Sequence, residues 1–289
     1  MKKNRPSMTA AQVAAYRGLG SFLRQEDRLA EDPYGLRFGG AWSRALGAVF
    51  SRAPRLGERI LERGPLGRLV GWLQLRTRAI DDAVMAFARG DGRQIVILGA
   101  GYDSRASRLS STLAHTTVFE IDHPATSARK ARILEELAPP SARVVRLEWD
   151  FETRPVGELP AALSALGHAP GEVTLTLWEG VTMYLSEPAI EATVAAVHAL
   201  SSPGSRFIFN YLDRAAIDHP DLVARAAHFI GEPMVFGWDP LALPAWLRAR
   251  GFVVVRDRSD FDLGAELLPH RDPRAFSNGM RRIATAERL

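Results

Sequence analysis

The sequence contains no cysteine. This absence excludes disulfide bonds, zinc–thiolate sites and cysteine nucleophiles, and we expect no metal site. Long apolar runs are also missing, because the runs at 95–100 and 174–178 are far shorter than the roughly 20 residues that span a bilayer. The N-terminal segment is basic but has no apolar stretch of the kind found in secretory signals. We therefore expect a cytoplasmic protein that does not bind membranes.

Charge of one sign is not concentrated anywhere in the chain. The 37 basic and 33 acidic residues leave a net charge of only +4. No block of five like charges occurs, and no aromatic residues alternate with the arginines as they do in single-stranded nucleic-acid sites. We expect a small-molecule ligand and no nucleic-acid partner, and the sequence leaves the oligomeric state open.

The first 90 residues differ in pattern from the rest of the chain. They indicate helices separated by Gly and Pro, at 9–30, 41–50, 56–63 and 68–89. The last of these has an apolar stripe at helical spacing, which Arg76, Thr77 and Arg78 interrupt. We interpret residues 1–90 as a helical cap on a second domain at 91–289.

From residue 94 onward, short apolar runs alternate with helical stretches. The runs predict strands at 94–99, 116–122, 142–150, 173–180, 205–212 and 252–257. Helices are expected at 124–137, 188–200 and 240–250, each beginning with a proline that suits a first helical turn. A weaker stretch at 276–284 would add an edge strand as the seventh, and the segment near 213–236 would be a lid-like insertion. Alternating strands and helices predict an α/β fold, with a mostly parallel sheet covered by helices on both faces.

The turn after the first predicted strand reads Gly99-Ala100-Gly101-Tyr102-Asp103-Ser104. Two glycines let the backbone turn sharply and approach a ligand. A dinucleotide site would have a third glycine where Ser104 stands, and Asp103 would repel a pyrophosphate. The turn is therefore a poor phosphate site.

Acidic residues follow the next three predicted strands, in Glu120-Ile121-Asp122, Asp150-Phe151 and Glu179-Gly180. Ligands of parallel sheets bind at the carboxyl ends of the strands, so these acids are expected to lie together. They suit a ligand with a ribose diol, an exocyclic amine and an ammonium group, and S-adenosylmethionine has all three. Its carboxylate would need a cation, for which Arg76 and Arg78 are candidates.

The segments LGAGYDSR, EIDHP and EGVTMYL, in this order, resemble the leucine carboxyl methyltransferase family, including its bacterial branch of polyketide-tailoring O-methyltransferases. The resemblance covers roughly residues 9–285. It implies a class I methyltransferase fold, which is Rossmann-like, with an N-terminal helical cap. It also implies an S-adenosyl-L-methionine cofactor, with S-adenosyl-L-homocysteine as product.

The resemblance also implies roles for single residues. Arg76 would hold the cofactor carboxylate, with Arg17 of the first helix as a second candidate, and Glu179 would take the ammonium group. The remaining expected cofactor contacts are the turn residues Gly99, Ala100 and Gly101, then Glu120 and Asp122 at the ribose, and Asp150 and Phe151 at the adenine.

The acceptor decides which further residues the reaction needs. A carboxylate, with a pKa of about 4, is already ionised at neutral pH and needs orientation rather than a base. Candidates for this role are Arg105, Tyr184, Asn210 and Tyr211, although Arg105 could instead form a salt bridge between sheet and helix and Tyr184 could simply pack. We expect a methyl ester on a small natural product such as a polyketide.

Two other interpretations stay open. A phenol or alcohol acceptor would profit from a base, for which His219 or His228 are candidates, whereas His123 would lie nearer the cofactor. A nicotinamide-dependent oxidoreductase is possible on a similar sheet, but the missing third glycine and Asp103 argue against it. The sequence alone does not separate an enzyme from a binding module that has lost turnover.

Overall fold

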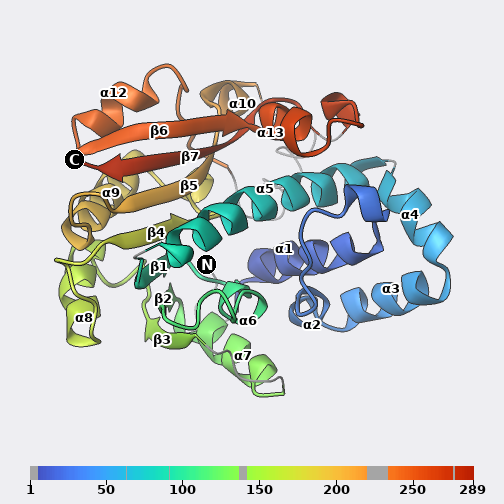
Figure 1. The fold of residues 1–289 in the computed structure, drawn as a ribbon, viewed down its shortest axis with the longest axis horizontal. Coiled ribbons are helices and arrows are strands. Elements are labelled where there is room, and N and C mark those ends of the chain that lie inside the picture. Colours follow the sequence, from blue (N-terminus) through green and yellow to red (C-terminus); the bar gives the residue numbers. More distant parts are fainter. Residues whose placement is uncertain (1–5, 63, 91, 137–141, 220–233, 276) are drawn as a thin grey trace.

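The computed structural model describes residues 6–62, 64–90, 92–136, 142–219, 234–275 and 277–289. Its centre is a seven-stranded sheet in the order β3-β2-β1-β4-β5-β7-β6 (Figure 1). Five strands run parallel: β1 (Gln94–Leu98), β2 (Thr117–Asp122), β3 (Arg143–Glu148), β4 (Thr174–Trp178) and β5 (Arg206–Leu212). This is the class I methyltransferase architecture that the sequence predicts.

The seventh strand corrects one prediction. β7 (Arg281–Arg288) is antiparallel to both of its neighbours and lies between β5 and β6 (Phe252–Ser259). The edge strand is therefore β6, not the C-terminal strand. Both segments are short and mix apolar with charged residues, so only the pairing of β7 with β5 decides which of them is central.

Helices cover both faces of the sheet, and each face has its own core. On one face, Val96 and Leu98 of β1 pack with α8 (Leu159–Ala165), α9 (Glu187–Leu200) and α12 (Leu243–Arg248). On the other, Ile95 and Ile97 pack with α5 (Gly64–Arg89), α6 (Arg105–Arg108) and α13 (Asp260–Leu267). All residues of β1 and β4 are buried because both of their faces are covered.

The N-terminal region forms a helical layer beside the long α5. It contains α1 (Met8–Leu19), α2 (Gly35–Gly39), α3 (Ala41–Arg52) and α4 (Pro54–Glu62), drawn in blue in Figure 1. The predicted helix at 9–30 ends at Leu19 and continues as two 3-10 turns, η1 (Gly20–Phe22) and η2 (Gln25–Asp27). Since α5 packs on both α1 and the sheet core, it joins the cap to the rest of the molecule.

The remaining elements are short or begin later than expected. α7 (Pro124–Leu134) begins at Pro124 as predicted, whereas α12 begins after Pro240, at Leu243. The helices α2, α8, α10 (Arg214–Asp218) and α13 were not predicted, because they are too short to show a clear period. The 3-10 turns η3 (Val156–Glu158), η4 (Thr182–Tyr184) and η5 (Pro273–Ala275) complete the chain.

Two boundaries from the sequence are not decided by the structure. The division at residue 90 stays a prediction, and most of the lid-like insertion near 213–236 lies outside the described residues. Over the part of the chain that the structure describes, no helix is both long enough and apolar enough to cross a membrane.

Candidate active site

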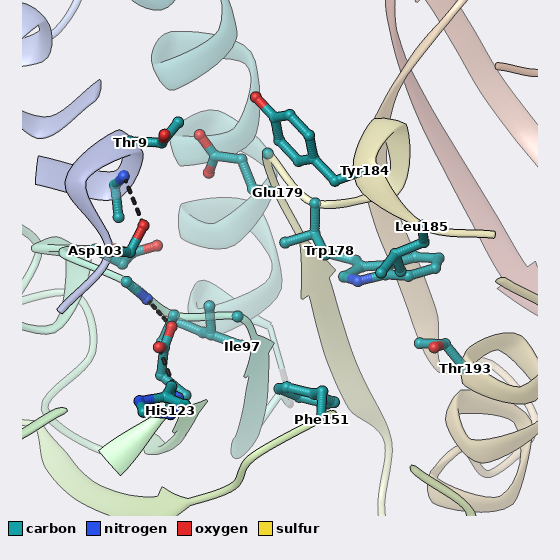
Figure 2. A pocket seen from close by; sticks show the side chains of 18 of the residues that line it. Thr9, Ile97, Asp103, His123, Phe151, Trp178, Glu179, Tyr184, Leu185 and Thr193 are labelled. Atoms are coloured by element: carbon teal, nitrogen blue, oxygen red, sulfur yellow. Dashed lines mark hydrogen bonds between the residues drawn. The ribbon is translucent and has the colours of Figure 1, made fainter. Parts of the chain in front are cut away.

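A cavity of about 560 Å³ opens at the carboxyl ends of β1, β2, β3 and β4. This volume is within the range of small-molecule sites. Its floor is the turn after β1, and one face of α1 forms part of its wall. Figure 2 shows that Asp103, Glu179, Tyr184, Phe151 and His123 surround the space from different strands.

The glycine turn after β1 is shaped by close packing. Gly99 has φ +66°, and a Cβ there would lie 2.8 Å from Cγ2 of Val181. Gly101 has φ +48°, and its Cβ would lie 3.2 Å from Cβ of Ala10 in α1. Both conformations disfavour other residues, so the turn brings its backbone against both the β4 loop and the cap.

Asp122, at the end of β2, lines the cavity and holds the turn. Its Oδ2 accepts a hydrogen bond from the Gly101 amide at 2.5 Å, and its Oδ1 accepts one from the His123 amide at 2.7 Å. Burial raises the pKa of Asp122 above its ordinary value, although these two amide donors oppose the shift. The neighbouring His123 accepts a hydrogen bond from the Ala125 amide through Nδ1 at 3.2 Å and so caps α7.

Asp150 and Phe151 follow β3 on the same side of the cavity. The amide of Glu152 donates to Oδ1 of Asp150 at 3.0 Å, and this hydrogen bond lowers the pKa of Asp150. The ring of Phe151 is 43% exposed and forms an apolar wall, as Figure 2 shows. A carboxylate beside an open aromatic face fits an amine on a flat ring.

Glu179, at the end of β4, is held between two arginines. Its Oε1 lies 2.7 Å from Nε of Arg76, and its Oε2 accepts a hydrogen bond from Nη1 of Arg105 at 2.7 Å. Burial would raise the pKa of Glu179, but Arg105 and Arg76 outweigh it and hold the pKa below its ordinary value. Glu179 and Arg76 line the cavity, whereas Arg105 does not.

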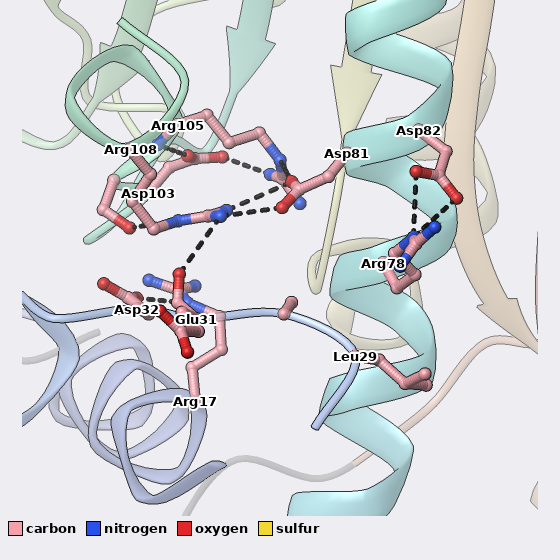
Figure 3. A network of polar contacts seen from close by, with 12 residues as sticks. Arg17, Leu29, Glu31, Asp32, Arg78, Asp81, Asp82, Asp103, Arg105 and Arg108 are labelled. Carbon is pink, nitrogen blue, oxygen red and sulfur yellow. Dashed lines mark hydrogen bonds and ion pairs between the residues drawn. The ribbon is translucent and has the colours of Figure 1, made fainter. Parts of the chain in front are cut away.

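A larger buried network extends from this pair to the cap (Figure 3). Arg105 also pairs with Asp103 and, at 2.7 Å, with Asp81 of α5, which in turn accepts from Arg108 at 2.7 Å. Arg17 of α1 donates to Asp32 and to the carbonyl oxygen of Tyr102, both at 2.7 Å. The network thus fixes α1, α5, the turn after β1 and the end of β4 relative to one another.

The charges in this network balance. Burial raises the pKa of Asp103, but Arg105, Lys130 and Arg17 outweigh that effect and hold its pKa well below the ordinary value. For Arg105, burial alone would lower the pKa, but Asp103, Glu179 and Asp81 together raise it. Four arginines pair with four carboxylates in this network. The arginines are Arg17, Arg76, Arg105 and Arg108, and the carboxylates are those of Asp32, Asp81, Asp103 and Glu179. A ligand group that carries both an ammonium and a carboxylate leaves this balance unchanged.

Three of the four residues predicted to orient the acceptor do not reach the cavity. Arg105 is buried in the network, which is the salt-bridge alternative that the sequence left open. The side chain of Asn210 accepts a hydrogen bond from the Gly180 amide at 2.6 Å, and the hydroxyl of Tyr211 donates to Asp257 at 2.6 Å. Burial raises the pKa of Tyr211. Tyr184 alone of the four lines the cavity.

Two predicted cofactor candidates also point elsewhere. Glu120 faces α7, where its oxygens lie 2.9 Å from Nζ of Lys130 and 3.3 Å from Nε of Arg146. Residues two apart on a strand share a face, so Glu120 and Asp122 differ in their place along β2: Asp122 is its last residue, whereas Glu120 lies farther back, opposite Lys130 of α7. Arg78 forms an exposed ion pair with Asp82 at 2.8 Å on α5. Arg17, Arg76, Gly99, Ala100 and Gly101, which were predicted to contact the cofactor, all line the cavity, and their contacts with it stay a prediction.

Other cavity residues were not predicted. Thr9, Ala10, Val13 and Arg17 lie on the side of α1 that lines the cavity, next to Ser7, which caps this helix. Their helical spacing was a usable signal, but nothing local shows that this face meets the cavity. On the opposite side lie Trp178, Leu185, Thr193 and Val235. His219 is exposed and does not line the cavity, and His228 lies outside the described residues.

A profile of known sequences decides the family. The profile described as leucine carboxyl methyltransferase matches residues 10–198, which is well over half of the chain. The chain belongs to the leucine carboxyl methyltransferase family. A relative from Mycolicibacterium smegmatis, described as an S-adenosyl-L-methionine-dependent methyltransferase, is 36% identical over 228 residues. The match covers 78% of this chain and 71% of the relative. A Streptomyces coelicolor relative with the same description is 37% identical, over 70% of this chain and 64% of its own.

Solved structures support the fold. A DUF574 family protein from Streptomyces avermitilis matches with a TM-score of 0.60 at 14% identity, covering 96% of this chain and 97% of that one. An S-adenosylmethionine-dependent methyltransferase from Mesorhizobium loti matches with a TM-score of 0.50 at 15% identity, over 73% of this chain and 97% of that one.

Because the chain belongs to this family, it is an S-adenosyl-L-methionine-dependent methyltransferase. This finding overturns the oxidoreductase alternative. The cavity fits that cofactor. The turn after β1 has no Cβ at Gly99 or Gly101, so a ligand can approach its backbone. Asp122 and Asp150 offer carboxylate oxygens as hydrogen-bond acceptors. Glu179 and Arg76 form an ion pair whose charges match those of an amino-acid group. We assign the amino-acid end of the cofactor to Arg76 and Glu179, the ribose to Asp122, and the adenine to Asp150 and Phe151, as predictions that binding studies can test.

Proposed function

We propose that this family member methylates the carboxylate of a small molecule and forms a methyl ester. One observation carries the proposal. The cavity wall formed by η4, the start of α9 and Val235 consists of Val181, Tyr184, Leu185, Ala189, Thr193 and Val235. Among these described lining residues none is a histidine, lysine, aspartate or glutamate. We take this wall as the acceptor side, because the residues that we assign to the cofactor, among them Arg76, Asp122 and Glu179, line other parts of the cavity.

The chemistry of such a wall favours an acceptor that is already charged. S-Adenosylmethionine supplies a methyl group activated on a sulfonium, so the protein has to align the acceptor and exclude water. A carboxylate needs no base at neutral pH, whereas a phenol, with a pKa of about 10, gains from one. Leu185, Val181 and Val235 shield the acceptor from water, and the hydroxyl of Tyr184 is the group that we assign to orient it.

The proposal names the acceptor only as a small carboxylic acid. The family name points to carboxyl methylation, and the descriptions of the two relatives name no acceptor. A polyketide substrate and a cytoplasmic location remain predictions from the sequence. Since the match covers 71% and 64% of the two relatives, the reaction of the whole protein is part of the same proposal.

The test is a panel of aromatic acids and the corresponding phenols, incubated with purified protein and methyl-labelled cofactor. We expect label in products that release methanol in mild base, as esters do, at a rate that does not rise between neutral and alkaline pH. A base-stable ether, formed faster as the pH approaches 10, would overturn the carboxylate proposal.

A variant of Tyr184 tests the assigned orientation. Tyr184→Phe removes only the hydroxyl, and we expect kcat/KM for the acid to fall about tenfold, the effect of roughly 1.4 kcal/mol. Binding of S-adenosylhomocysteine should be unchanged. An unaltered kcat/KM would remove Tyr184 from the mechanism.

A further inference from the structure

Two residues that lie outside the cavity hold Glu179 from two sides. Arg105 binds its carboxylate through Nη1 at 2.7 Å, and the side-chain oxygen of Asn210 accepts from the amide of the next residue, Gly180, at 2.6 Å. Neither Arg105 nor Asn210 lines the cavity, and both are buried. Any effect of Asn210 on a bound ligand must therefore act through the β4 loop, and any effect of Arg105 through Glu179 or through Asp103, which also lines the cavity.

The backbone of this loop needs such support. Gly180 has φ +76°, a left-handed conformation at the point where the chain leaves β4. Asn210 of β5 anchors the loop twice, because its carbonyl oxygen also accepts a hydrogen bond from the hydroxyl of Thr182 at 2.9 Å. β5 pairs with β4 in parallel, so the anchor belongs to the rigid centre of the sheet.

The side chain of Glu179 is equally constrained. Arg105 is only 3% exposed at its side chain. Its Nη1 donates to Asp103 as well as to Glu179, and its Nε donates to Asp81, so three elements fix its position. A guanidinium with several fixed partners orients a carboxylate in a way that a single flexible ammonium does not. The bond from Arg105 occupies Oε2 of Glu179, while Oε1 faces Nε of Arg76, a residue that lines the cavity, at 2.7 Å.

We propose that Arg105 and Asn210 are positioning residues that orient Glu179 toward the amino-acid end of the cofactor. Arg105 fixes the carboxylate and Asn210 fixes the backbone that carries it. This inference rests on the assignment of Glu179 to the ammonium group of the cofactor. It predicts that the loss of either residue selectively weakens ligands that contain an amino-acid group.

The experiment compares two ligands by calorimetry with the full chain. S-Adenosylhomocysteine contains adenine, ribose and the amino-acid group, whereas 5′-methylthioadenosine contains only the first two with a thioether. For Arg105→Lys and for Asn210→Leu, we expect S-adenosylhomocysteine to bind about tenfold more weakly, the effect of one charged hydrogen bond. Binding of 5′-methylthioadenosine should stay within about twofold.

Arg108→Lys is the matched control. Arg108 lies on the same helix and in the same network, where it contacts Asp81 and Ser104 but not Glu179. Its variant should leave the ratio of the two affinities unchanged. Equal weakening of both ligands in Arg105→Lys and Asn210→Leu would mean a merely structural role and would overturn the proposal.

Glu179→Gln separates the two levels of the inference. If it leaves the ratio unchanged, the assignment of Glu179 to the ammonium group is wrong, and the positioning role falls with it. If it lowers affinity for S-adenosylhomocysteine alone while the Arg105 and Asn210 variants do not, only the positioning role is wrong. If Arg105→Lys does not fold, as thermal unfolding would show, Asn210→Leu decides alone.

Discussion

The two sides of the cavity hold their carboxylates by different means. On the ion-paired side, Asp103 and Glu179 contact buried arginines from other elements. On the amide-bound side, Asp122 and Asp150 accept hydrogen bonds from backbone amides, two of them one or two positions away and the third at Gly101, 21 residues away. The first side depends on charged side chains that meet in the core, and the second depends on the backbone shape of the loops.

This difference sets how each side responds to pH and to mutation. Buried arginines hold the pKa of Asp103 and Glu179 below the ordinary value, whereas burial raises the pKa of Asp122. The ion-paired side should thus remain charged and rigid over the working pH range. Mutations there should reduce stability, while mutations on the amide-bound side should mainly reduce cofactor binding.

The largest expected effect comes from Arg105→Ala. It leaves Asp81, Asp103 and Glu179 buried without their shared cation, so the free energy of unfolding should fall by about 3–5 kcal/mol. Urea unfolding monitored by circular dichroism measures this. In the control Arg78→Ala, an exposed pair is lost and the change should be below about 0.5 kcal/mol. Similar losses in both variants would contradict a special role for the buried network.

Asp122→Asn should affect stability less than Arg105→Ala does, and cofactor binding more. The variant keeps one of two oxygen acceptors, so one amide donor loses its partner and stability should fall by about 1–3 kcal/mol. Affinity for S-adenosylhomocysteine should fall by about 1.5–3 kcal/mol, the value of hydrogen bonds to a charged acceptor. Calorimetry and urea unfolding of the same preparation test both parts. Strong unfolding with intact affinity would reverse the contrast between the two sides.

The pH dependence of binding offers a smaller and more specific test. As the pH falls, Asp122 is protonated at a pH above the ordinary carboxyl value of about 4, because burial raises its pKa. Glu179 and Asp103 stay ionised at that pH, because their pKa values are lowered. Affinity for S-adenosylhomocysteine should therefore decline as the pH falls through the raised pKa of Asp122, and this decline should be missing in Asp122→Asn. If the variant shows the same decline, a group other than Asp122 causes it.

The smallest expected effect is that of Phe151→Ala. The ring is 43% exposed, so its removal should leave stability almost unchanged. Loss of an aromatic face should weaken S-adenosylhomocysteine and 5′-methylthioadenosine equally, by about 0.5–1.5 kcal/mol. Calorimetry with both ligands measures this, and a loss confined to S-adenosylhomocysteine would place Phe151 at the wrong end of the cofactor.

Much of the cavity could be predicted from the sequence because its residues follow strands. The positions of Gly99, Gly101, Asp122, Asp150 and Glu179 depend on where four predicted strands end, and parallel strands bring those ends to one edge. Local hydrogen bonding then completes the amide-bound side with residues one or two positions away. These features need only hydrophobic periodicity and the direction of the strands.

The direction of single side chains could not be predicted in the same way. Glu120 and Asp122 are two positions apart on β2, yet one pairs with Lys130 of α7 and the other lines the cavity. Asn210 and Tyr211 lie near the end of a predicted strand, much as the acids do, but they bind the Gly180 amide and Asp257. Their partners lie 30 and 46 residues away, so no local pattern marks them.

The sequence by itself determined the α/β class, the strands and the acids at their ends, because these depend on local periodicity and on short turns. The tertiary structure decided that β7 lies inside the sheet, that one face of α1 lines the cavity, and that Arg105 is buried among Asp81, Asp103 and Glu179. The physical reason is the cost of burying a charge: an arginine leaves water only where several distant carboxylates converge on it, and only the folded chain brings them together.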